Sequence, residues 1–92
     1  MWWKTMMIIN KGSTVYYARI HHETGIYELC ELHVRTVYAD AFVGVDTQTK
    51  VAYYISFDEC DIFVFDNRND ALKVVKKAEE LKKDFTIDNS DE

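Results

Sequence analysis

The chain has 92 residues, 48% of them apolar, and a formal net charge of -5 that arises from 16 acidic and 11 basic side chains. This length and apolar content predict a single domain, residues 1–92, with one modest core, and exclude a disordered chain. The negative charge disfavours duplex nucleic acid as a partner, because affinity for a phosphate backbone grows with the number of cationic contacts. The composition therefore favours an acidic, soluble protein that binds other proteins.

Residues 1–11 are expected to form an N-terminal strand or arm. The apolar run after Lys4 is shorter than a membrane span of roughly 20 residues or a typical signal peptide, so we expect a cytoplasmic protein without membrane association. Trp2, Trp3, Met6 and Met7 either cover an open sheet edge or form an exposed arm for a partner.

Short segments rich in Tyr, Val, Ile and Phe follow one another through residues 12–65 and predict β-strands. Gly25 can take a positive φ and predicts a turn before the second segment. Gly44 lies within a predicted strand and indicates either a bulge or a close approach. The predicted strands are residues 14–20, 26–38, 41–46, 51–57 and 62–65, with one helical turn at 58–61 before the last strand.

The order of strand, single turn and short last strand resembles the end of a Src-homology-3-type, KOW or Tudor-like barrel. Residues 15–20 also resemble the first strand of such barrels. Strands this short must curl together to bury a face. The expected fold class is therefore α+β: a small antiparallel SH3-like β-barrel or a strongly bent sheet of about five strands, followed by one C-terminal helix.

A helix is expected over residues 66–84, with an N-cap from Asp66 or Asn67. Apolar residues recur at helical spacing and predict a stripe that lies either against the sheet or across one barrel mouth. The members of this stripe are Ala71, Val74, Val75, Ala78 and Leu81. The acidic tail, residues 85–92, is expected to fray.

No catalytic or metal-binding motif stands out, so we expect neither an enzyme nor a cofactor or metal site. Cys30 and His33 are separated by an odd number of residues in a predicted strand, which sends their side chains to opposite faces. Cys30 is expected to be a buried, reduced thiol. Asp58, Glu59 and Asp61 crowd one turn but lack the calcium-loop pattern, which favours a solvated turn.

The paired tyrosines are the best candidates for binding, because neighbouring residues in a strand place their rings on opposite faces. Tyr17 shares its face with Arg19, and Tyr54 is the second ring expected on an outer aromatic and guanidinium patch. His33 and Arg35 lie on the polar face of the second strand. The alternative is that the helix or the N-terminal arm covers these rings. The candidate binding residues are Tyr17, Arg19, His33, Arg35 and Tyr54.

Several segments resemble small uncharacterised proteins encoded by phages and mobile elements of Gram-positive bacteria. They are GSTVYYARI (12–20), GIYELCEL (25–32), VRTV (34–37), FVGVD (42–46) and the junction from 64–65 to 71–72. The resemblance implies a genetic setting and an accessory role in the host cytoplasm.

We therefore expect a non-catalytic interaction module that binds a host protein, with anti-defence inhibition as one specific form. The alternative is a small-molecule or single-stranded nucleic-acid binder that uses the aromatic face. An open edge strand would pair with a second copy as readily as with another partner, which leaves homo-oligomerisation open.

Overall fold

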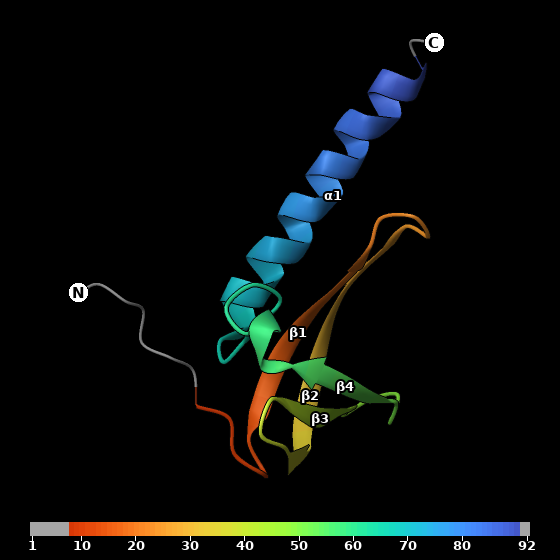
Figure 1. The fold of residues 1–92 in the computed structure, drawn as a ribbon. Helices are drawn as coiled ribbons and strands as arrows, with labels where there is room; N and C mark the ends of the chain where they lie inside the picture. The colour runs from red at the N-terminus through yellow and green to blue at the C-terminus, as the bar shows by residue number, and fades with distance from the viewer. Residues whose placement is uncertain (1–7, 91–92) are drawn as a thin grey trace, which may run out of the picture.

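A computed structural model of the chain describes residues 8–90, with the side chains of residues 8–81. Five strands form one antiparallel sheet in the order β4-β3-β2-β1-β5, and one long helix follows (Figure 1). The elements are β1 (Thr14–His21), β2 (Ile26–Val37), β3 (Ala41–Asp46), β4 (Ala52–Ser56), the 3₁₀ turn η1 (Phe57–Glu59), β5 (Val64–Phe65) and α1 (Arg68–Ser90). The predicted α+β class, the antiparallel sheet and the C-terminal helix are confirmed, while the sheet does not close into a barrel.

Strand β2 joins the two halves of the sheet. Its first part pairs with β1, from Ile26 opposite His21 to His33 opposite Thr14. Its second part pairs with β3, and the register shifts between Val34 and Thr36. Such a bulge bends the strand and increases its twist. The sheet curves far enough for residues of β4 to reach β1 across its concave face, although two strands separate them in the sheet order.

The main core fills this concave face. Gly44 of β3 leaves room for Leu32 of β2, because a Cβ added at Gly44 would lie 3.0 Å from the Leu32 Cβ. The predicted close approach at Gly44 is therefore confirmed, and the bulge lies on β2 instead. The buried members of the core are Ile9, Val15, Cys30, Leu32, Val34, Phe42, Ile55 and Val64.

Helix α1 packs on the opposite face of the sheet, against β1, β2 and β5. Ala71, Val75 and Ala78 of the predicted stripe are buried, and Ala18 of β1 is buried as well. Leu81 is not buried against the sheet as expected, since its side chain is 52% exposed. The helix also continues to Ser90, past the end predicted at residue 84 and into the segment expected to fray. Its last turns extend beyond the sheet (Figure 1).

The N-terminal arm is described only from Ile8 onward, so the expectations for Trp2, Trp3, Met6 and Met7 lie outside the described residues. Residues 8–11 form no strand, but Ile9 is buried in the core. Within residues 8–90, no helix is long and apolar enough to cross a membrane.

Candidate functional site

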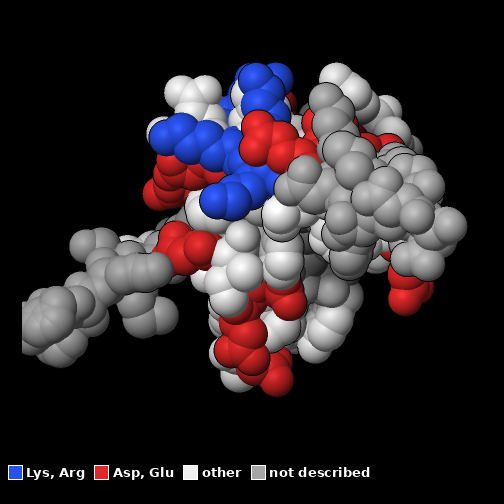
Figure 2. Space-filling model, turned by 90° about the horizontal axis from the view of Figure 1, so that it is seen from above, with Lys and Arg blue, Asp and Glu red and all other residues white. Residues whose placement is uncertain are grey.

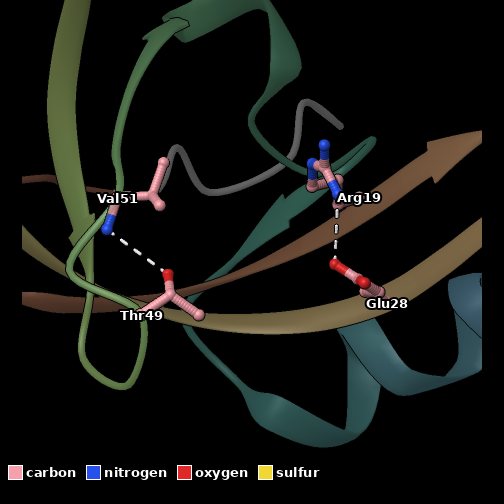
Figure 3. Close-up of polar contacts among 4 residues, drawn as sticks. All are labelled: Arg19, Glu28, Thr49 and Val51. Carbon is pink, nitrogen blue, oxygen red and sulfur yellow. Dashed lines mark hydrogen bonds and ion pairs between the residues drawn. The ribbon is translucent and has the colours of Figure 1, made fainter.

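Two of the predicted binding residues, Tyr17 and Arg19, lie on the concave face of the sheet. The Tyr17 ring meets the Tyr53 ring edge to face, with 5.6 Å between the ring centroids. The Arg19 Nη1 donates to Glu28 Oε1 at 3.1 Å (Figure 3), and the Arg19 guanidinium carbon lies 5.8 Å from the centre of the Tyr53 ring. Tyr53 and Glu28 therefore already engage Tyr17 and Arg19, and the rings of Tyr17 and Tyr53 pack against the core.

Burial, with a smaller effect from Glu59, raises the pKa of Tyr17. Burial also raises the pKa of Tyr53. Both phenols are therefore protonated at neutral pH, and neither is an activated base.

The other three predicted residues lie elsewhere. His33 is exposed on β2 and pairs with Val45, and Arg35 is exposed at the β2 bulge. Tyr54 of β4 is 68% exposed. Successive strand residues face opposite ways, so Tyr54 and His33 lie on the face away from Tyr53 and Cys30. The structure therefore does not gather the five residues into one patch: Tyr17 packs against the core with Arg19 beside the Tyr53 ring, whereas His33 and Tyr54 face outward.

Tyr38 is a partner of Tyr54 that sequence reasoning missed. Its side chain is 51% exposed, and its ring centroid lies 6.1 Å from that of Tyr54, with the ring planes tilted by 49°. Tyr38 follows the end of β2, where its N–H donates to the Ala41 carbonyl at 2.7 Å. No pattern along the chain links Tyr38 with Tyr54, because three paired strands bring them together. We call Tyr38 and Tyr54 the outer tyrosine pair.

A buried carboxylate, Asp46, organises the turn between β3 and β4. Its Oδ1 accepts hydrogen bonds from the backbone N–H of Gln48 at 2.7 Å and of Thr49 at 3.0 Å. In the same turn, the Val51 N–H donates to Thr49 Oγ1 at 3.3 Å (Figure 3). These contacts give Asp46 a structural role in the hairpin.

The two cysteines are free and poorly activated. Burial raises the pKa of the Cys30 thiol to about 11, with a further contribution from the Asp46 carboxylate. Burial also raises the pKa of Cys60. Because the thiolate is the nucleophile, neither cysteine is poised for covalent catalysis at neutral pH.

The acidic turn after β4 places Asp58 and Asp61 in solvent. The N–H of Asp58 donates to Ser56 Oγ at 3.1 Å, which caps η1. Among the side chains that the structure describes, no group of three or more His, Cys, Asp and Glu residues could hold a metal ion.

A shallow apolar groove of about 490 Å³ runs between α1 and the β1–β5 side of the sheet. Ile20, Phe63 and Leu81 line it, with Lys73 and Lys77 from the helix. Figure 2 shows described basic side chains gathered on the face seen from above, with acidic side chains beside them.

Comparison of the chain with protein-family models, curated proteins and solved structures found no match.

Proposed function

We propose that this protein is a non-catalytic interaction module of a phage or mobile element that acts in the host cytoplasm by binding a host protein. Anti-defence inhibition is the specific form that we favour. The observation that carries the proposal is the outer tyrosine pair: Tyr54 is 68% and Tyr38 51% exposed, and their rings touch. Tyrosine is enriched among the residues that dominate binding energy at protein interfaces.

The position of the pair supports this role. Helix α1 makes its main contacts with β1, β2 and β5, and not with β3 and β4. A tyrosine ring exposes a large apolar area at a low cost in side-chain entropy, and its hydroxyl supplies a hydrogen bond at the rim of an interface. The net charge of -5 favours a partner surface of positive potential, because complementary charge speeds encounter and improves selectivity.

We also propose that the fold is related to the SH3-like barrels. The 3₁₀ turn η1 between β4 and the short strand β5 supports this relation, as does the strong curvature of the sheet.

The test is capture of a partner from a Gram-positive host lysate with three forms of the immobilised protein. They are the wild type, the double variant Tyr38→Ala/Tyr54→Ala and the control Ile62→Ala, which removes a side chain that is 55% exposed at a different site. Tyr17→Ala is unsuitable, because Tyr17 is part of the core wall.

We expect one host protein to be retained by the wild type and the control and lost from the double variant. With that protein purified, titration calorimetry should show a dissociation constant about tenfold or more higher for the double variant. If the double variant retains the same protein with equal affinity, the outer tyrosine pair is not the binding surface.

A further inference from the structure

The described sheet has two edges: the two-residue strand β5, and β4, which pairs only with β3. Two hydrogen bonds fix which backbone groups face the free edge of β4. The Val51 carbonyl accepts from the Asp46 N–H at 2.8 Å, and the Phe57 N–H donates to the Asp40 carbonyl at 3.0 Å. Both bonds point toward β3. Because backbone groups alternate along a strand, the N–H and C=O groups of residues 53 and 55 also face β3, whereas those of residues 52, 54 and 56 face the free edge.

Within the strand itself, this edge lacks the charge or proline that often protects an exposed strand. Residues 51–57 include no charged residue and no proline, and they are rich in β-branched and aromatic side chains. Natural edge strands usually carry a lysine, a proline or an inward-pointing charge that prevents pairing with another strand. Ala52 and Tyr54 are exposed, so an incoming strand can reach the edge. The composition of β4 therefore favours a strand partner.

We propose that a second copy of this chain pairs along this edge, antiparallel to β4 and with a two-fold axis at Tyr54. Each Tyr54 would then lie opposite the second copy's Tyr54, and the two residues would exchange both N–H···O=C bonds, because the N–H and C=O of Tyr54 both face the edge. Ala52 would lie opposite the second copy's Ser56. The two sheets would become one continuous sheet.

The charges at the ends of the strand select this occupant. Lys50 precedes β4 and Asp58 follows it, at equal distances along the chain from Tyr54. The antiparallel arrangement brings the Lys50 end of each copy to the Asp58 end of the other, where opposite charges attract. A parallel arrangement would place Lys50 against Lys50 and Asp58 against Asp58, so it is disfavoured.

The dimer would also unite the two outer tyrosine pairs. Residues directly opposite each other in an antiparallel pair have side chains on the same face of the sheet. Both Tyr54 rings would therefore be neighbours on the outer face, with a Tyr38 ring beside each. This self-association needs no host partner, so its test is independent of the proposed function.

Sedimentation velocity of the full chain over a range of concentrations tests the proposal. We expect a species of twice the 10.8 kDa monomer mass. The variants Lys50→Asp and Asp58→Lys each replace attraction by repulsion at both ends of the interface, so each should dissociate about tenfold more readily. An equimolar mixture of the two variants restores opposite charges at both ends, and it should dimerise like the wild type.

Ala52→Pro provides a second, independent measurement. It removes an N–H that faces the free edge and so leaves the pairing of β4 with β3 unaltered, whereas the matched control Ala52→Val keeps the N–H. We expect the proline variant to be monomeric with an unchanged circular dichroism spectrum, and the valine variant to dimerise.

Three results would overturn the proposal. The first is a wild-type chain that stays monomeric up to about 1 mM, which would mean that another segment or another partner covers the edge. The second is a dimer that persists in Ala52→Pro, which would place the interface elsewhere. The third is a mixture of the two charge variants that associates no better than either variant alone.

Discussion

The Asp46 carboxylate is 7% exposed, and its surroundings explain how a charge is accommodated there. The backbone N–H of Thr49, and then that of Gln48, hold the pKa of Asp46 below its ordinary value, against the opposing effect of burial. The Cys30 thiol adds a further hydrogen bond that favours the ionised form. Because these donors bind the charged form best, the hairpin between β3 and β4 is most stable when Asp46 is ionised.

Asp46→Asn tests this at the residue scale. A carboxyl group whose pKa is lowered by folding stabilises the protein above its unfolded pKa of about 4, and this stability is lost as the pH falls through the folded pKa. The variant should therefore unfold about 1 kcal/mol more easily than the wild type at pH 7, and the difference should shrink toward pH 3. Urea unfolding of both proteins at each pH measures it, and the other carboxyl groups cancel in the comparison. If the difference in free energy of unfolding between the variant and the wild type stays constant down to pH 3, packing at this position, and not the charge of Asp46, causes the difference.

Among the secondary-structure elements, α1 begins at a well-defined cap. Asn67 Oδ1 accepts hydrogen bonds from the N–H of Asn69 at 2.7 Å and of Asp70 at 3.3 Å. These N–H groups have no partner within the helix, and the side chain of Asn67 satisfies them. The cap fixes where the chain turns from β5 into the helix, and it thereby sets which residues of α1 face the sheet.

Asn67→Ala should lower the free energy of unfolding by about 1 kcal/mol, because it removes the acceptor for both N–H groups. Asn67→Asp is the matched control: it keeps an acceptor and adds a charge that favours the helix N-terminus, so it should unfold like the wild type. Urea denaturation monitored by circular dichroism measures both variants. If both variants lose the same free energy of unfolding, Asn67 stabilises the protein through a contact other than the helix cap.

The elements themselves were predictable from the sequence because their signals are local. Alternation marked β2 and β3 to within a residue, and Gly25 has the predicted positive φ, +73°. Asn67 was likewise recognisable as a cap. Leu81 was expected to be buried but lines the open groove with Ile20 and Phe63, and a periodic pattern does not reveal how closely a helix approaches the sheet at each turn.

At the scale of the whole molecule, the candidate site was only partly predictable. Alternation correctly separated Tyr53 from Tyr54, but it could not say which ring faces the core. The curvature of the sheet decides this, because it brings Tyr53 of β4 against Tyr17 of β1 and leaves Tyr54 outside. The same curvature places Tyr38 beside Tyr54. Such contacts join residues that are distant in the chain, and no local pattern encodes them.

The distribution of charge over the whole molecule separates protein binding from the alternative, single-stranded nucleic-acid binding. Stacking of bases on exposed rings needs a cationic groove beside them to follow the phosphates. Arg19 is already paired with Glu28, and the chain has a net charge of -5. The overall negative charge therefore opposes the approach of a phosphate backbone to the outer tyrosine pair.

We accordingly expect no gel shift of single-stranded RNA or DNA by this protein at about 0.15 M salt. The informative control is the same titration at low salt, because weak electrostatic binding would appear there for the wild type and for Tyr38→Ala/Tyr54→Ala alike. A shift at the higher salt that the double variant abolishes would instead assign the outer tyrosine pair to base stacking. In that case the partner of this surface would be a nucleic acid and not a host protein. The same rings serve both roles, because a ring that anchors a protein interface also presents a face on which a base can stack.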